Sequence, residues 1–338
     1  MLNGYDIIGD IHGCADKLEI LLARLGYVKR DGVWKHSERL AVFLGDYIDR
    51  GPQILETLKI IRDMREVGSA VALMGNHEFN AVCWNTPDPA RPGEYLRPHS
   101  EKNRLQHAET LDQLAGCYQM WISWIRTLPL WLELGDLGGG GGCLHMVHAC
   151  WSQDAIDILI HSERNGEMMI QGRHDAPLMS DKGYVYAGRD RDSIEFHAIE
   201  TLLKGPEVPL PESVSFIDKD GVERHNIRVK WWLGPGRCCE RALLGEDQLK
   251  DLPETAVIEP DVWQAVPVEY PTFFGHYWRS PGEDVAAFGP KIACLDFSAV
   301  KGGPLVAYRW NRGDTEIKDE NFLWVDKPAD AEVRMFFP

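Results

Sequence analysis

The chain has 338 residues, of which 44% are hydrophobic, and a formal net charge of −16. This length and apolar content can bury the core of one large domain or of two smaller ones. The strong negative charge argues against a broad surface for nucleic acid or anionic lipid, because such surfaces bind through many lysines and arginines.

Neither a membrane span nor a secretion signal is predicted. The first residues, MLNGYDIIGD, contain no basic segment followed by an apolar one, and no run of about 18 apolar residues occurs. The eight cysteines form no CxxC pair, and a chain of this length does not need disulfides for stability. We therefore expect a cytoplasmic protein with reduced thiols and no membrane contact.

The N-terminal part alternates predicted strands and helices. Residues 5–8 form an apolar strand pattern, and leucines at helical spacing follow between residues 16 and 26. The pattern repeats with a strand at 40–44, an amphipathic helix at 54–68 and a third strand at 69–74 that ends at a polar loop. This alternation predicts a parallel-sheet α/β core, in which ligands bind beyond the carboxyl ends of the strands.

Beyond Glu78 the alternation gives way to two long segments. A loop rich in Pro and Asn and a helix at about 108–126 form an expected insertion at about 79–127. Two strands joined by five glycines come next, followed by a cap-like insertion at about 151–271, in which DKDG predicts a β-hairpin. Strand-like segments return in the tail. We expect one domain over residues 1–338, with the cap shaping the substrate entrance.

Five polar motifs adjoin the predicted strands. They are GDIHG (9–13), GDYIDRG (45–51), GNHE (75–78), VHAC (147–150) and FGHYW (274–278). Their Asp, Asn and His side chains offer oxygen and imidazole donors, which suit two divalent ions such as Mn, Fe or Zn and not a structural zinc–thiolate site. Glycines beside these residues allow sharp turns, so that side chains from neighbouring strand ends can converge.

At these motifs the sequence resembles the calcineurin-like metallophosphoesterase superfamily. Within it, the similarity is to the branch that contains the serine/threonine phosphoprotein phosphatases and the bacterial diadenosine tetraphosphatases. The resemblance covers residues 1–80 closely and then anchors near His148 and His276. It implies an α/β fold of the four-layer α/β/β/α sandwich type with a cap-like insertion. It also implies two divalent metal ions, with Mn²⁺ preferred and Fe or Zn as alternatives.

The resemblance also implies a role for each motif residue. Asp10 and His12 would hold the first metal, and Asp46 would bridge the two. The second metal would be held by Asn76, His148 and His276.

Three further residues would act on the substrate. His77 is the implied general acid, Asp49 would orient it, and Arg50 would bind the phosphoryl oxygens as a bidentate fork. The implied nucleophile is a hydroxide shared by the two ions.

The chain departs from the family pattern at two positions. Cys150 stands where family members usually have glycine, and Trp278 stands where many have a histidine. The absence of this histidine fits the phosphoprotein phosphatase-like branch, in which water fills the position. His145 is a second candidate near His148, but strand alternation points it to the opposite face. Several arginines could supply a second substrate-binding guanidinium, and the sequence does not choose among them: Arg173, Arg189, Arg191, Arg237 and Arg279.

The sequence thus predicts a metal-dependent phosphoric ester hydrolase acting on a phosphorylated substrate, a phosphoprotein or a nucleotide. A serine/threonine phosphatase-like phosphomonoesterase is the preferred hypothesis, and a diadenosine tetraphosphatase-like pyrophosphohydrolase is the alternative. A non-catalytic scaffold would be expected to lack a ligand or the acid histidine, and neither is missing. A nucleic-acid phosphatase or nuclease would be expected to carry a basic stripe, which the acidic composition argues against.

Overall fold

The computed structural model describes most of the chain, namely residues 2–135, 143–161, 185, 188–217, 223–243, 246–280 and 282–326. Three features singled out in the sequence lie outside the described residues: the five-glycine run, the DKDG turn and Arg173. Within the described residues, every helix is too short or too polar to span a lipid bilayer.

The first sheet has the strand order β17–β16–β1–β4–β5. Its strands are β1 (Gly4–Ile8), β4 (Arg39–Phe43), β5 (Ala70–Ala72), β16 (Leu305–Asn311) and β17 (Phe322–Val325). β1, β4 and β5 are parallel, whereas β16 and β17 are antiparallel to their neighbours. The parallel core predicted from the sequence therefore forms one half of this sheet, and the C-terminal strands add an antiparallel half.

The second sheet has the order β15–β14–β7–β6. Its strands are β6 (Trp131–Gly135), β7 (Cys143–Val147), β14 (Thr272–Phe274) and β15 (Ile292–Cys294). β7, β14 and β15 are parallel, and β6 runs antiparallel to β7. The chain thus enters this sheet through one antiparallel hairpin and completes it after the long cap segment.

The two sheets pack face to face because their side chains alternate with period two. Ile7 and Val42 of the first sheet join Leu144, Met146 and Phe273 of the second in one buried apolar cluster. The residues at the alternate positions of these strands point to the other face of each sheet, toward the helices. This arrangement places one apolar core between the two sheets, as the four-layer expectation requires.

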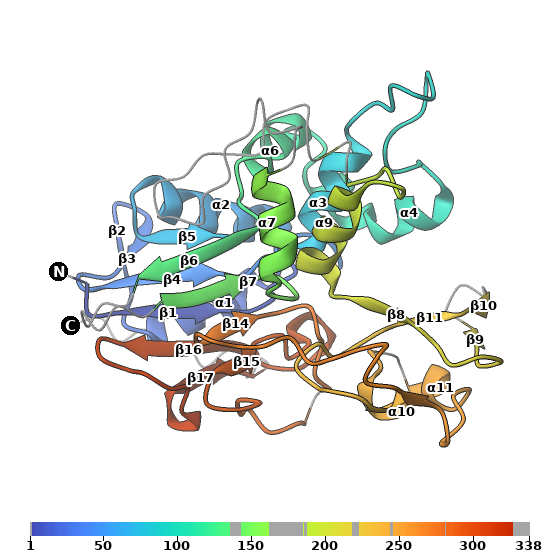
Figure 1. Ribbon diagram of the computed structural model, residues 1–338. Coiled ribbons are helices and arrows are strands. Elements are labelled where there is room, and N and C mark those ends of the chain that lie inside the picture. Colours follow the sequence, from blue (N-terminus) through green and yellow to red (C-terminus); the bar gives the residue numbers. More distant parts are fainter. Residues whose placement is uncertain are drawn as a thin grey trace.

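Helices cover the outer faces of both sheets (Figure 1). α1 (Ala15–Arg24) and α2 (Ile54–Glu66) bury leucine, isoleucine and methionine side chains at helical spacing. α7 (Gln153–His161) and α9 (Ile194–Lys204) pack beside each other. The amide of Ala149, just past the end of β7, donates to Leu202 of α9. The resulting order of layers is helix, sheet, sheet, helix.

Two sequence expectations need correction at element level. GNHE is not in a loop: α3 (Asn76–Trp84) begins at its asparagine, with Gly75 as the N-cap residue. The helix expected at about 108–126 is two helices, α5 (Ala108–Gln113) and α6 (Tyr118–Ile125). Gly116 lies between them, where its low helix propensity favours a break.

The remaining described elements form two projections, a peripheral hairpin and two short 3₁₀ helices beside the C-terminal strands. They are β2 (Val28–Arg30), β3 (Val33–Lys35), α4 (Glu101–Gln106), β8 (Glu207–Pro209), β9 (Phe216–Ile217), β10 (Glu223–Arg224), β11 (Asn226–Arg228), β12 (Gly236–Arg237), α10 (Cys238–Arg241), α11 (Glu246–Leu249), β13 (Val257–Ile258) and two 3₁₀ helices, η2 (Ala299–Lys301) and η3 (Asp319–Asn321).

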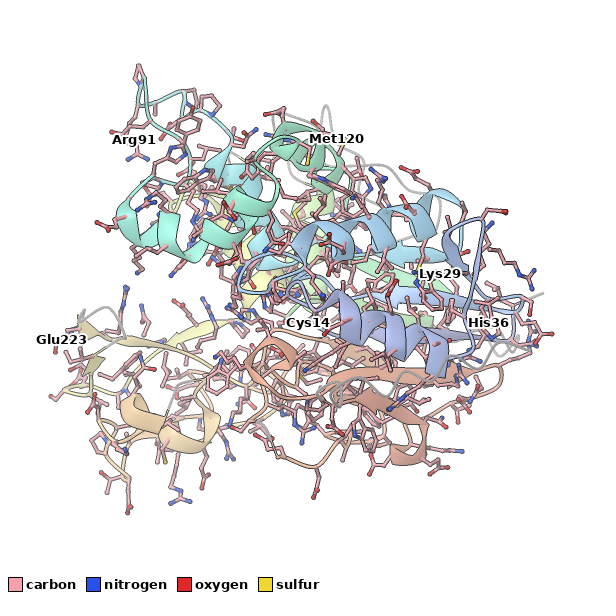
Figure 2. The ribbon with its side chains drawn as sticks, turned by 180° about the vertical axis from the view of Figure 1, so that it is seen from behind. Cys14, Lys29, His36, Arg91, Met120 and Glu223 are labelled. Atoms are coloured by element: carbon pink, nitrogen blue, oxygen red, sulfur yellow. The ribbon has the colours of Figure 1, made fainter. Side chains whose placement is uncertain are left out.

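The projections lie at the same end of the molecule. Arg91 marks one and Glu223 the other in Figure 2. β9 and β10 pair antiparallel on either side of DKDG, as the predicted hairpin requires. The segment that contains β8 to β13 has an apolar cluster of its own, centred on Ile227, Val229 and Cys238. The limits of the two expected insertions stay predictions.

Candidate active site

The polar motifs meet where the carboxyl ends of the two sheets adjoin. Asp10 follows β1, Asp46 follows β4, and His148 and His276 follow β7 and β14. The segments after the strands approach closely here, both within the first sheet and between the two sheets, so that glycine is required at two contacts. A Cβ on Gly45, whose φ is +105°, would lie 2.7 Å from the backbone of Gly75. A Cβ on Gly275 would lie 1.9 Å from an Asp10 carboxylate oxygen.

Several residues of the motifs adopt left-handed backbone conformations, although they are not glycine. They are His12 (φ 44°), Asp46 (54°), Asp49 (65°), Arg50 (69°) and His276 (62°). Such conformations cost about 1–3 kcal/mol each and cluster at functional sites when the surrounding structure holds them. The surrounding structure therefore holds these turns in backbone conformations of higher energy, which direct their side chains into the site.

Glu78 holds two of these motifs together. Its carboxylate, which is fully buried, accepts hydrogen bonds from the backbone amides of Gly75, Asp46, Tyr47 and Ile48 at 2.8–3.3 Å. Burial, and then the charge of Asp46, raises its pKa to about 7. This role of Glu78 was not predicted from the sequence, although the residue lies inside the GNHE motif.

Asp46 lies at the centre of the site. Its Oδ2 atom is 3.4 Å from His12 Nε2, and its Oδ1 atom is 3.4 Å from His148 Nε2. The amide of His77 donates to Oδ1 at 3.1 Å. The carboxylate is thus placed between two groups of candidate ligands, one around His12 and one around His148 and His276.

The other candidate ligands converge on the same space. Asn76 Oδ1 is 3.0 Å from His148 Nε2 and 2.9 Å from His276 Nδ1. The amide of His276 donates to Asp10 Oδ2 at 3.1 Å. All six side chains predicted as metal ligands therefore lie together.

Backbone carbonyls fix the direction in which two of the imidazoles present a lone pair. His12 Nδ1 donates to the carbonyl of Ile48 at 2.7 Å, and His148 Nδ1 donates to that of Leu44 at 2.9 Å. The ring proton is then on Nδ1, and the Nε2 atom of each ring, which lies on the side of Asp46, carries a lone pair that a metal ion can use. Such support of a ligand histidine by a carbonyl is usual at metal sites.

The charges of the site favour a bound cation. Burial, and then the carboxylates of Asp296 and Asp46, raises the pKa of Asp10 well above its usual value. Burial lowers the pKa of His12 to about 3, so its imidazole is neutral near pH 7. Buried carboxylates beside neutral imidazoles and an amide oxygen form a donor set that fits divalent ions such as Mn, Fe or Zn. Asp296, which follows β15, was not identified from the sequence.

His77 and Asp49 form a supported pair. His77 Nδ1 lies 2.5 Å from Asp49 Oδ2. The other oxygen, Oδ1, accepts from His107 Nδ1 at 2.6 Å and from the Thr110 hydroxyl at 2.5 Å. His107 in turn contacts the Tyr118 hydroxyl at 2.9 Å. His107, which no sequence motif marks, is buried behind the proposed acid.

Arg50 spans the mouth of the site. One terminal nitrogen lies 2.9 Å from His12 Nε2 and the other 3.0 Å from His77 Nε2. The guanidinium therefore reaches both the ligand group around His12 and the proposed acid. This position is consistent with the phosphate-binding role that the resemblance implies.

A cleft with a volume of about 1170 Å³ opens from the site toward the cap. It begins at His12, Arg50 and His276 and extends past Phe196 and Phe216. Trp278 lies on its rim with 40% of its surface exposed. Its ring centroid is 5.5 Å from Lys301 Nζ.

The candidate arginines differ in whether they line the cleft. Arg191 lines it, whereas Arg189 donates to Asn80, Arg237 pairs with Glu240 and Arg279 donates to the carbonyl of Ala286. Arg228 also lines the cleft and is held by Glu207. No motif surrounds Arg228, so it was not predicted from the sequence.

His145 lies away from the cleft, as strand alternation predicted. Its ring stacks on Trp151 with centroids 3.6 Å apart. Cys150, which replaces the usual glycine, is fully buried and does not displace His148 from the site.

Comparison with known proteins gives curated relatives that are named tetraphosphatases. A bis(5'-nucleosyl)-tetraphosphatase PrpE [asymmetrical] of Bacillus velezensis is 46% identical over 194 residues, which are 55% of this chain and 74% of the relative. Its counterpart in Bacillus subtilis is 29% identical over 196 residues, 55% of this chain and 75% of the relative. A symmetrical bis(5'-nucleosyl)-tetraphosphatase of Vibrio parahaemolyticus is 24% identical over 310 residues, which are 90% of this chain and 94% of that protein.

The matches to solved structures have low sequence identity. A putative diadenosine tetraphosphatase matches with a TM-score of 0.44 and 15% identity, over 97% of this chain and 96% of that one. A serine/threonine phosphatase of Saccharomyces cerevisiae matches with a TM-score of 0.47 and 13% identity, over 97% and 81%.

The model of one family matches more than half of the chain. Residues 5–208 match the calcineurin-like phosphoesterase family, which implies divalent metal ions at the site described above. The matched segment includes the motifs at Asp10, Asp46, Asn76 and His148. The chain therefore belongs to the calcineurin-like phosphoesterase family and is a hydrolase of phosphoric ester or anhydride bonds.

Proposed function

We propose that the protein hydrolyses a phosphoric anhydride bond of a dinucleoside polyphosphate. The observation that carries this proposal is the size and lining of the cleft, which has a volume of about 1170 Å³ and combines aromatic rings with arginines next to the candidate metal ligands. Small-ligand pockets commonly measure about 300–1,000 Å³, so a substrate much larger than one phosphorylated side chain fits. The similarity to curated tetraphosphatases supports the same choice.

The candidate ligands would hold two divalent ions. Asp10 and His12 would bind one ion, Asp46 would bridge, and the second would be bound by Asn76, His148 and His276. Mn²⁺ is the preferred metal, with Fe and Zn as alternatives. When bound, such ions activate a water molecule as the nucleophile and neutralise charge on the phosphoryl oxygens.

The side chains around the metal ligands have separate tasks. Arg50 would bind two phosphoryl oxygens with its planar fork. In the free protein this guanidinium contacts His77 Nε2 at 3.0 Å, so binding of a phosphoryl group would release that nitrogen to carry a proton. Asp49 accepts from His77 Nδ1 and thereby keeps Nε2 directed at the substrate. His77 would then protonate the leaving phosphate oxygen.

Two residues of the cleft would bind the remote half of the substrate. Arg228, held by Glu207, would contact a distal phosphate, and Trp278 offers an exposed ring face for a base. Base–aromatic stacking contributes about 1–3 kcal/mol by alanine substitution. A Trp278→Ala variant should therefore bind the dinucleotide more weakly than the parent but hydrolyse a small chromogenic phosphomonoester equally well.

The test is a substrate panel assayed with metal-depleted protein reconstituted with Mn²⁺. The panel contains diadenosine tetraphosphate, a phosphothreonine peptide, a chromogenic phosphomonoester and a phosphodiester, with His77→Asn and Asp46→Asn as inactive controls. We expect the highest kcat/KM for the dinucleotide. A preference for the phosphothreonine peptide would replace our proposal with the protein phosphatase hypothesis, and silence on every substrate with metals bound would leave only a scaffold role.

A further inference from the structure

The β6–β7 hairpin carries three metal-binding side chains on its outer face. In the antiparallel register Glu133 lies opposite His145, and Gly135 lies opposite Cys143. Because side chains alternate along a strand, Cys143 and His145 share a face, and Glu133 lies on the same face as its cross-strand partner. Leu144, between them, belongs to the core between the sheets. The register of the sheet therefore brings a thiol, an imidazole and a carboxylate together.

The three groups already lie near the spacing of a metal site. Their ligand atoms lie within 4.8 Å of one another, and the Cys143 thiol donates to Glu133 Oε1 at 3.2 Å. In a tetrahedral zinc site, bonds of about 2.1–2.3 Å separate neighbouring ligand atoms by about 3.5 Å. Small side-chain rotations would bring these atoms to that separation.

The environment of His145 is the observation that most directly points to a bound ion. Only 8% of its surface is exposed, and its ring is held flat against Trp151. Among the described residues, none forms a hydrogen bond with either of its ring nitrogens, which keep some access to solvent and are therefore free to bind an ion. One ring nitrogen instead faces the atoms of Glu133 and Cys143.

Access and charge also suit a cation. Glu133 is exposed and Cys143 is partly exposed, so an ion can enter from solvent. A second carboxylate, Glu269, acts electrostatically on both Cys143 and His145. Lys291 is a positively charged neighbour, and its ammonium group donates to the backbone carbonyl of Glu269 at 2.6 Å.

We propose that Glu133, Cys143 and His145 bind one divalent ion, zinc, at a site separate from the active site. Thiolate, imidazole and carboxylate are ligands that zinc uses together, with water available for the fourth position. Cys143 is five residues before His148, or about 16 Å along the strand at about 3.3 Å per residue. An ion there would link the two strands of the hairpin and would stabilise the fold without taking part in hydrolysis.

Cobalt(II) titration of the full chain tests this site without relying on activity. Thiolate ligation gives Co²⁺ a charge-transfer band in the near ultraviolet, which the oxygen and nitrogen donors of the active site cannot produce. We expect a band whose amplitude at saturation corresponds to one thiolate-bound Co²⁺ per chain, in addition to the ions taken up by the active site, and that Zn²⁺ removes by displacement. The band should be absent from Cys143→Ser and from His145→Phe, which keeps the ring stacked on Trp151.

Two control variants distinguish this site from the remaining cysteines and from the active-site metals. Cys239→Ser, which alters another partly exposed cysteine, should keep the band. So should Asp46→Asn, which weakens the active-site metals. Phosphohydrolase activity equal to that of the parent would show that Cys143→Ser is folded. A parent spectrum without the band, or a band that survives in Cys143→Ser, would overturn the proposal.

Discussion

At the scale of single residues, the proposed acid depends on side chains outside the sequence motifs. Thr110 donates to Asp49 Oδ1 and accepts from the Asp49 amide at 2.9 Å. His107 donates to the same oxygen. Both belong to the segment at the start of α5, far along the chain from the motif. Asp49, which has a positive φ, is thus fixed through both its backbone and its carboxylate.

We expect Thr110→Val to lower kcat by roughly tenfold to a hundredfold, because a hydrogen bond to a charged group contributes about 1.5–3 kcal/mol. KM should stay near the parent value, since Thr110 does not line the cleft. Thr110→Ser, which keeps the hydroxyl, should recover most of the activity. Steady-state kinetics on the three proteins provide the measurement, and equal kcat for Val and Ser variants would contradict a positioning role.

The pH dependence of kcat should report the partnership of His77 and Asp49. Burial alone would lower the pKa of His77, but the carboxylates of Asp46 and Asp49 raise it above its usual value. A general acid must be protonated, so activity should fall as pH rises through this raised pKa. Asp49→Asn removes one of the two charges and should move the alkaline limb to lower pH. A pH–kcat profile with saturating metal measures this shift, and a limb that stays in place would reject His77 as the titrating acid.

At the scale of elements, Glu78 connects the N-terminus of α3 to the turn after β4. Four backbone amides donate to its carboxylate, and a glutamine would present an NH₂ group to some of them. We expect Glu78→Gln to lower the free energy of unfolding by about 1–3 kcal/mol and to weaken metal binding through the displaced Asp46 backbone. Urea unfolding and Mn²⁺ titration measure the two effects. Glu66→Gln, at the exposed end of α2, is the matched control, and an equal loss in both variants would contradict the connecting role.

The same elements explain what the sequence could predict. The metal-ligand motifs are local: a short apolar strand followed by glycine and a polar residue identifies Asp10 and Asp46 without knowledge of the fold. Asp296 has no such signature, because LDFS contains no glycine, and it reaches the site only through the parallel pairing of β15 with β14. Thr110 and Arg228 are likewise placed by contacts between distant segments. Sequence patterns therefore identified the motif residues and missed those that only the tertiary fold brings beside them.

At the scale of the whole molecule, the candidate metal ligands join two halves of the fold. Asp10 and Asp46 extend from the first sheet, whereas His148 and His276 extend from the second. Ions bound by both pairs would link the sheets at the edge where their apolar core ends. A ligand that binds only the folded state stabilises it by RT ln(1 + [L]/Kd), or about 2.7 kcal/mol at 100 times Kd.

Chelation should therefore lower the unfolding temperature, and Mn²⁺ should restore it in a concentration-dependent manner. His148→Ala removes a ligand that belongs to the second sheet, so its unfolding temperature should respond less to Mn²⁺ than that of the parent. His161→Ala, at the exposed C-terminal end of α7, should respond as the parent does. Thermal unfolding of the three proteins over a range of Mn²⁺ concentrations measures the effect. If His148→Ala gained as much stability as the parent, the ions would be bound without the second sheet, and the proposed ligand set would have to be revised.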